Sequence, residues 1–205
     1  MVKDKLVELE NILGEGLKKF GYRRKRMYRF ECKIDGGIQY ITYLPTKTRG
    51  KEEVYIDIYA GFNYPDLNKI VSFIKNEQWR KGYSSASHNI YVLINPKKIY
   101  GFYIDQNTDV APIAENILLN VEKYVFPFLE KCNTLEKFEA MLLKRDDLTR
   151  RSTLERPEWN LLALSLLLER NNIDDLIKEY YEDFSKNLTL LQVAQEQIKK
   201  YDNSF

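Results

Sequence analysis

Residues 28–44 read YRFECKIDGGIQYITYL, and this stretch decides the fold because two alternating segments flank a turn signal. On the first segment, charged residues separate four residues that share one face: Tyr28, Phe30, Cys32 and Ile34. Asp35-Gly36-Gly37 is typical of a tight turn, and GIQYITYL at 37–44 forms the second arm. Side chains alternate between the two faces of a strand, so the stretch predicts a β-hairpin.

Further strands are predicted after the hairpin. Residues 53–62 alternate apolar Val54, Ile56, Ile58 and Ala60 with Tyr55, Asp57, Tyr59 and Gly61. The stretch 82–88 is loop-like, and it leads to the strand-like runs NIYVLI at 89–94 and KKIYGFYI at 97–104. We therefore expect an antiparallel sheet of about five strands, which is a usual size.

Helical spacing precedes the hairpin and recurs between the strands. Leucines three and four residues apart predict a helix over residues 3–20 that ends near Gly21: Leu6, Leu9, Leu13 and Leu17. Pro65, at a first helical position, opens a short helix whose inward residues are Leu67, Ile70, Val71 and Ile74. Helices thus bracket and interrupt the sheet.

The helical period returns over residues 107–144. Pro127 is expected to end or kink the helix there, because proline lacks the backbone N–H that an inner turn needs. Asn133 or Thr134 is suited to cap the helix that follows. Pro157 begins another helical pattern, and further short helices are expected beyond Asn171.

These patterns predict the α+β class, with the helices at 3–20 and 107–144 packed mostly on one face of the sheet. Residues 144–151 lack apolar periodicity and mix charges of both signs. We therefore expect an α+β domain over residues 1–145 and a helical extension over 146–205 that docks on it.

Composition limits the class of protein. The chain has 205 residues, of which 44% are hydrophobic and 30% charged, as in soluble globular proteins. Its 32 basic and 30 acidic residues give a net charge of +2, too small to indicate a surface made wholly for nucleic acid or anionic lipid. Cys32 and Cys132 are far apart, and the N-terminal MVKDKLVELE lacks an apolar stretch. We expect a cytoplasmic protein with reduced thiols that does not enter a membrane.

Cofactor chemistry finds little support in the sequence. His88 is the only histidine, which excludes a multi-histidine metal site. Gly14-Glu15-Gly16 resembles part of a phosphate loop, but it lies within a predicted helix and follows no strand. We therefore expect no metal, no cofactor and no catalytic residues.

A hydrolase remains as an alternative. Ser84, Ser85 and Ser87 lie beside His88, and Asp105 could complete a serine- or carboxylate-based site. Sequence neighbours seldom form a catalytic triad, and serine-rich loops are common for turn chemistry alone. The sequence favours a protein that is not an enzyme.

A basic segment at residues 18–29 reads KKFGYRRKRMYR, with seven cations and three aromatic residues. Arginines neutralise phosphates and aromatic rings stack on bases, so Arg23, Arg24, Arg26 and Arg29 are candidates for nucleic-acid binding. The competing interpretation is a helix end followed by a soluble sheet edge, where cations are also favoured.

Tyrosines form a second candidate surface. The chain has 15 tyrosines, and Tyr55, Asp57 and Tyr59 share the polar face of the strand at 53–62. Tyrosine is favoured in recognition surfaces because it offers a large contact area at low entropic cost. The alternative is that other elements cover this face and the tyrosines fill the space.

Three segments together resemble a bacterial family known as domain of unknown function 4304. They are LKKFGYRRKRMYRF at 17–30, VYIDIYAGF at 54–62, and the stretch at 107–144 with its long helix, proline-containing break and second short helix. The resemblance covers roughly residues 3–145. It implies an α+β fold and no established activity, so it supplies no site residues.

The sequence thus favours a cytoplasmic protein-binding module with another protein as partner. An immunity-like role, in which the module neutralises a toxin, is an analogy based on size and composition. The alternatives are a nucleic-acid-binding module that uses residues 18–29 and a hydrolase of unknown substrate.

Overall fold

The hairpin predicted from residues 28–44 is present in the computed structural model of the chain. Strands β2 (Arg29–Ile34) and β3 (Gly37–Lys47) pair antiparallel, with Arg29 opposite Thr42 and Ile34 opposite Gly37. Gly36 in the turn has a φ of 63°, a left-handed conformation that glycine adopts at no steric cost.

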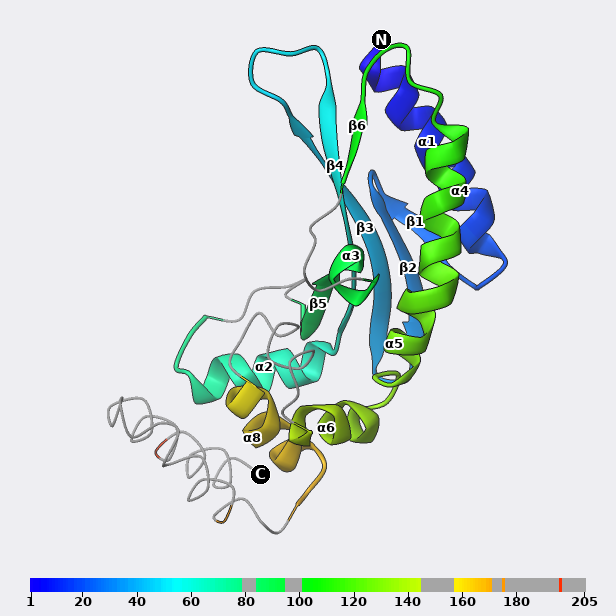
Figure 1. Cartoon of the computed structure of the whole chain (residues 1–205). Coiled ribbons are helices and arrows are strands. Elements are labelled where there is room, and N and C mark those ends of the chain that lie inside the picture. Colours follow the sequence, from blue (N-terminus) through cyan, green and yellow to red (C-terminus); the bar gives the residue numbers. More distant parts are fainter. Residues whose placement is uncertain (79–83, 95–100, 145–156, 171–174, 176–195, 197–205) are drawn as a thin grey trace. The chain divides into compact units, whose positions relative to one another are not determined.

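Six strands of the described part of the chain form one sheet (Figure 1). β1 (Arg23–Arg26) lies at one edge, followed by β2, β3 and β4 (Val54–Asn63). β4 also pairs with β5 (Ala86–Asn89) and, through its first residues, with β6 (Phe102–Ile104). The α+β class and the antiparallel sheet are confirmed. The sequence does not predict β1, because RRKR has no apolar alternation.

Two predictions in the middle of the chain are wrong. The run NIYVLI, expected as a strand at 89–94, forms the short helix α3 (Ile90–Ile94), and the expected loop at 82–88 includes most of β5. Short apolar runs fit a strand or a buried helix, and Ile90 is completely buried, so packing outweighs its β-propensity. Of the strand expected at 97–104, residues 102–104 form a strand, and residues 97–100 lie outside the described residues.

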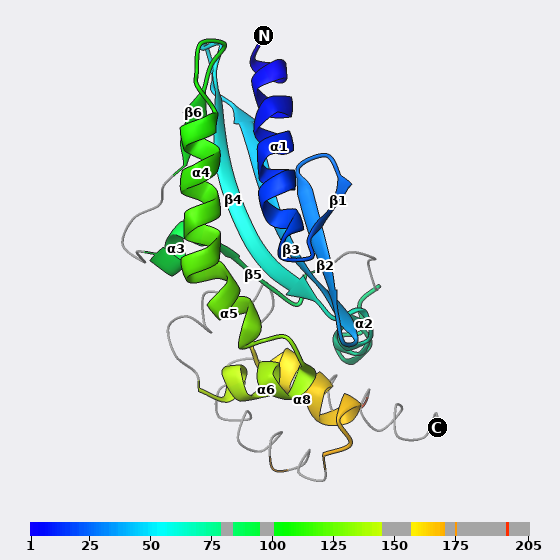
Figure 2. The ribbon, with the colours of Figure 1, turned by 90° about the vertical axis from the view of Figure 1, so that its right-hand side faces the viewer.

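Helix α1 (Val2–Lys18) lies over one face of the sheet (Figure 2) and buries its predicted leucine stripe. Its end has the hydrogen bonds of a Schellman motif, in which Tyr22 N–H donates to Leu17 O and Gly21 N–H donates to Lys18 O. Gly21 has a φ of 84°. The helix therefore ends where the sequence predicts, and the chain turns directly into β1.

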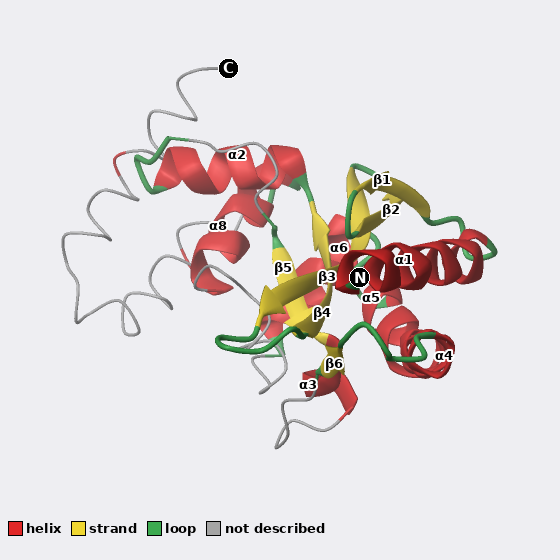
Figure 3. Ribbon diagram, turned by 90° about the horizontal axis from the view of Figure 1, so that it is seen from above, coloured by secondary structure: helices red, strands yellow, loops and turns green. Residues whose placement is uncertain are grey.

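Helix α4 (Ala111–Asn120) lies beside α1 over the same face, as the view from above shows (Figure 3). It continues through a π-helical segment, η1 (Val121–Val125), into α5 (Phe126–Glu130). The Phe126 N–H donates to Val121 O, five residues back. The interruption expected at Pro127 is thus a π-helical turn rather than a helix end, and such turns often accommodate a missing donor.

The buried side-chain amide of Gln39 links the C-terminal end of α5 to the sheet. Gln39 of β3 accepts a hydrogen bond from the Tyr22 hydroxyl (3.0 Å), and its Nε2 donates to the Leu129 carbonyl of α5 (3.0 Å). Leu129 is near the end of α5, where helix carbonyls lack intrahelical donors. The side chain thus joins α5, β3 and the residue before β1.

The structure describes residues 1–78, 84–94, 101–144, 157–170, 175 and 196. Two compact units share the chain: one contains residues Met1–Phe62 and Ser87–Asn133, and the other contains Asn63–Ala86 and Thr134–Phe205. The predicted boundary between residues 145 and 146 lies outside the described residues.

The second unit contains three described helices: α2 (Pro65–Ile74), α6 (Leu135–Leu143) and α8 (Pro157–Leu167). α8 packs against both α2 and α6. The inward residues predicted for α2 are all buried, and Thr134 caps α6 by accepting a hydrogen bond from Lys137 N–H. The helices predicted beyond Asn171 fall outside the described residues.

We predict that Gly21→Ala lowers the free energy of unfolding by ~1 kcal/mol, because an L side chain is strained at this left-handed φ. The added Cβ would lie 3.5 Å from the Cys32 sulfur, an ordinary contact, so backbone strain is the only cost. Urea unfolding measures the loss. Gly21→Asn is the control and should lose less, because asparagine tolerates this conformation, and equal losses in the two variants would contradict the explanation.

Candidate binding site at the edge of the sheet

The predicted basic segment becomes a sheet edge. β1 consists of Arg23, Arg24, Lys25 and Arg26, all four exposed, and it pairs with β2 alone among the described strands. Its register with β2 shifts between Arg24 and Arg26, as in a β-bulge. Four consecutive cations therefore lie along a strand whose outer side has no neighbour in the sheet.

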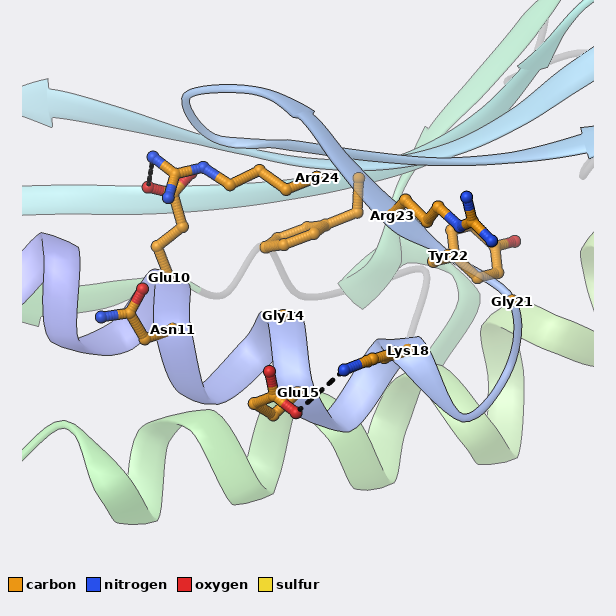
Figure 4. Close-up of a pocket in the computed structure, with 10 residues that line it drawn as sticks. Glu10, Asn11, Gly14, Glu15, Lys18, Gly21, Tyr22, Arg23 and Arg24 are labelled. Carbon is orange, nitrogen blue, oxygen red and sulfur yellow. Dashed lines mark ion pairs between the residues drawn. The ribbon is translucent and has the colours of Figure 1, made fainter.

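Glu10 of α1 joins the helix to this edge. Its carboxylate is 2% exposed, and Oε2 lies 2.7 Å from Nη2 of Arg24, whose side chain is 49% exposed. Its Oε1 accepts a hydrogen bond from the Tyr28 N–H at 2.7 Å. Figure 4 shows the carboxylate and the guanidinium pointing toward each other. A buried carboxylate needs such partners, so Glu10 fixes Arg24 on the α1 side of β1.

Tyr28, in the turn between β1 and β2, has a φ of 68°, which is uncommon outside glycine. Besides the bond from its N–H to Glu10, its carbonyl accepts hydrogen bonds from Thr42 Oγ1 (2.7 Å) and Tyr43 N–H (3.0 Å). The surrounding groups thus hold this turn, and with it the position of β1.

The four predicted arginines are not equivalent. Arg29 lies 2.7 Å from Glu31 and stacks over the Tyr40 ring at 3.9 Å, so its guanidinium is occupied within the fold. Arg24 is held by Glu10. In the part of the chain that the structure describes, neither Arg23 nor Arg26 forms an ion pair. These two cations are the ones available to a ligand.

The aromatic residues of the basic segment each pack against another ring. Phe20 and Tyr22 both contact the Phe126 ring, at centroid distances of 4.4 and 5.8 Å. Tyr28 packs on Tyr43 at 4.9 Å. Burial raises the pKa of the Tyr22 hydroxyl well above its usual range. Tyr22 is buried and Phe20 and Tyr28 are half-buried, so each ring loses at least part of its surface to packing.

A pocket of about 560 Å³ lies between α1 and β1 (Figure 4). From α1 it is lined by Glu10, Asn11, Gly14, Glu15 and Lys18. The other wall is formed by residues 21–24 and by Phe30 of β2. The sequence did not reveal this pocket. The residue that could have indicated the pocket is Gly14, because a glycine within a helix often marks a close approach. Here the helix backbone at Gly14 lies close to the Phe30 ring.

The predicted tyrosine surface is half-buried. Tyr55, Asp57 and Tyr59 all have intermediate exposure on β4. The Tyr55 ring packs on Tyr103 at 5.1 Å, and Asp57 accepts a hydrogen bond from Asn89 (3.1 Å). Burial and the nearby Asp57 carboxylate raise the pKa of Tyr55. The structure keeps the three side chains together but covers part of their surface.

His88, Ser85 and Asp105, which the sequence offered for a hydrolase site, all have contacts within the fold. His88 is 3% exposed, and its ring packs edge-on against Phe128. The Ser85 hydroxyl accepts from Tyr64 N–H and donates to Asn68 Oδ1. Asp105 accepts from the Thr108 hydroxyl and from Asn107 N–H, which lowers the pKa of its carboxyl and forms the turn before α4. Each of the three side chains thus contacts other groups of the fold: a ring for His88, two hydrogen-bond partners for Ser85 and a turn for Asp105.

Among the described residues, no group of three or more histidine, cysteine or acidic side chains is placed to hold a metal ion. None of the described helices is both long and apolar enough to cross a lipid bilayer. No protein-family model, no curated protein and no solved structure matches this chain. The resemblance to domain of unknown function 4304 therefore stays a prediction, and the geometry of the site carries the functional argument.

We predict that Arg24→Met lowers the free energy of unfolding by about 1 kcal/mol, because it leaves the buried Glu10 carboxylate without its cation. Arg23→Met is the matched control, on the same strand but without an ion pair, and should leave stability unchanged within error. Chemical denaturation compares the two. Equal stability of both variants would show that the Glu10 pair does not hold the edge.

We predict that the two cysteines differ sharply in reactivity in the native protein. Cys132 is completely buried, and burial raises the pKa of its thiol to about 12, so little thiolate forms at pH 8. Cys32 is half-buried. Under native conditions a thiol reagent should label Cys32 first, and Cys132 should react at the rate of unfolding. Mass spectrometry of the labelled peptides measures both rates, with Cys32→Ser isolating the slow thiol.

Proposed function

We propose that this chain is a protein-binding module that recognises an extended acidic segment of its partner by adding that segment as a strand to β1. The observation that carries the proposal is an exposed edge strand made entirely of cations. Both parts of this observation, the open edge and the charge, contribute to recognition.

The open edge supplies backbone hydrogen bonds. Along an edge strand, every second residue directs its N–H and C=O away from the neighbouring strand. β1 pairs only with β2 among the described strands, so these groups on its outer side face away from the sheet. A peptide in extended conformation can pair with them, as in other cases of β-strand addition.

The charge selects the occupant. Arg23, Lys25 and Arg26 are exposed, and Arg23 and Arg26 have no ion pair among the described residues. Like charges on adjacent strands repel, which disfavours pairing of this edge with the same edge of a second copy. Glutamate or aspartate side chains on an added strand would instead be attracted. The partner is therefore inferred to be acidic at the contact.

Nucleic acid fits this surface less well. Bases bound to single-stranded sites stack on free aromatic faces, and the rings of Phe20, Tyr22 and Tyr28 are packed against other rings. Two of the four predicted arginines, Arg24 and Arg29, are already paired with carboxylates. The predicted immunity-like role and the cytoplasmic location are consistent with an acidic protein partner but remain predictions.

We predict that a short peptide with glutamate alternating with valine binds the full chain and slows hydrogen exchange of outward-facing backbone amides in β1. NMR of the isotopically labelled protein measures both binding and exchange. A peptide with glutamate alternating with proline carries the same charge but cannot form the strand, so it should not bind. If both peptides bind equally well, charge attraction alone explains the binding, and the proposal of strand addition is wrong.

Charge reversal tests the same surface from the protein side. Arg23→Glu combined with Arg26→Glu should weaken peptide binding at least about tenfold. Lys47→Glu combined with Arg49→Glu changes the net charge equally at exposed residues outside β1 and should have little effect. Binding of a single-stranded oligonucleotide in place of the peptide, with a steep salt dependence that the β1 reversal flattens, would establish the nucleic-acid alternative instead.

A further inference from the structure

The pocket beside β1 indicates which side chains the added segment carries. We infer that the pocket between α1 and β1 receives a bulky aromatic side chain of the acidic segment, flanked in sequence by acidic residues. This inference rests on the proposed function, since it assigns a role to the pocket only when a strand lies along β1.

The pocket lies at the edge of the sheet that β1 forms, on the side that faces α1. The α1-facing side of β1 is marked by Arg24, which is held by Glu10 of the helix. Asn11, Gly14, Glu15 and Lys18 of α1 line the same space. A strand added to β1 would lie ~4.8 Å further out, and its side chains on that face would point into the layer between the helix and the sheet.

The pocket is open because α1 has no large apolar side chain on this side. The leucine stripe of α1 is buried, whereas the pocket-lining positions are glycine, asparagine and charged residues. A Cβ at Gly14 would lie 3.4 Å from the Phe30 ring, so the helix backbone itself is close to the ring. A volume of about 560 Å³ is large enough for a bulky side chain together with water.

The chemistry of the lining favours an aromatic anchor. Phe30 and Tyr22 line the pocket but are only 1% and 3% exposed, so Arg24 and Lys18 are the more accessible of its lining side chains. Arg24 is half-exposed, and the Lys18 side chain is 72% exposed, so both can lie against the face of an inserted ring. Aromatic residues at the centre of an interface commonly dominate its binding energy.

Side chains of a strand alternate between its two faces, and this alternation indicates which residues flank the aromatic residue in the bound segment. If one residue of the segment enters the α1 layer, its neighbours lie on the opposite face. The neighbours of Arg24 are Arg23, which also lines the pocket, and Lys25, and both are exposed. Acidic residues on both sides of the aromatic residue would therefore be placed near cations that Glu10 does not hold.

The test compares three peptides in which glutamate alternates with apolar residues and only the central apolar residue differs: valine, alanine or tryptophan. Isothermal titration with the full chain should show the tryptophan peptide binding at least about tenfold more tightly than the alanine peptide. The β1 amides should be protected by all three, because the backbone pairing is common to them.

The pocket itself is tested by filling it. Asn11→Trp places a large ring at an exposed pocket-lining position of α1 and should abolish the preference for tryptophan over alanine. Asn116→Trp is the matched control: it makes the same change at an exposed position of α4 outside the pocket, and should keep the preference. Circular dichroism confirms that both variants fold.

The outcomes separate the two proposals. Equal affinity of the tryptophan and alanine peptides, with β1 amides still protected, would overturn the aromatic anchor and leave strand addition intact. A preference for tryptophan that survives Asn11→Trp would also overturn it, because the ring would then bind elsewhere. Failure of every peptide to protect β1 would overturn both proposals.

Discussion

The carboxylate of Glu10 is the group on which the edge of this sheet depends. It is almost completely removed from water, and each of its oxygens has one partner: the Arg24 guanidinium and the Tyr28 N–H. A helix residue thereby holds one residue of β1 and the turn that connects β1 to β2. The same interaction keeps Arg24 on the helix side, where it lines the pocket together with Arg23, while Arg23, Lys25 and Arg26 stay exposed.

Where apolar side chains repeat with a simple period, the sequence alone predicted the helix or strand correctly. The hairpin at 28–44, the strand at 53–62, the leucine stripe of α1 and the inward residues of α2 follow from period two or period 3.6. Burial agrees with the pattern in β4, α1 and α2, whereas in β2 only Phe30 of the predicted apolar face is buried. The short run at 89–94 shows the limit, because Ile90 can be buried in a helix as well as in a strand. Periodicity over so few residues does not distinguish the two.

The sequence predicted the basic residues of the candidate site but not the contacts that decide their roles. The basic run at 18–29 identifies the surface, but its edge position depends on the pairing of β1 with β2, which has no apolar signature. Glu10 follows Leu9 in the helix, and nothing in its local sequence distinguishes it from a solvated charge. The opposite happened with Arg29, which the sequence grouped with the available cations and the fold pairs with Glu31 and Tyr40. Long-range partners decide these roles.

The second unit is assembled from two separate parts of the chain, and this has a consequence for the order of events on the ribosome. α2 ends at Ile74, whereas α8, against which it packs, begins at Pro157. At typical elongation rates the intervening segment takes on the order of ten seconds to synthesise. During that interval the apolar face of α2 lacks the helix that covers it, while the β2–β3 hairpin, whose strands are adjacent in sequence, has all of its own residues available. Newly made chains therefore pass through a period in which the sheet can form and α2 is a surface for chaperones to bind.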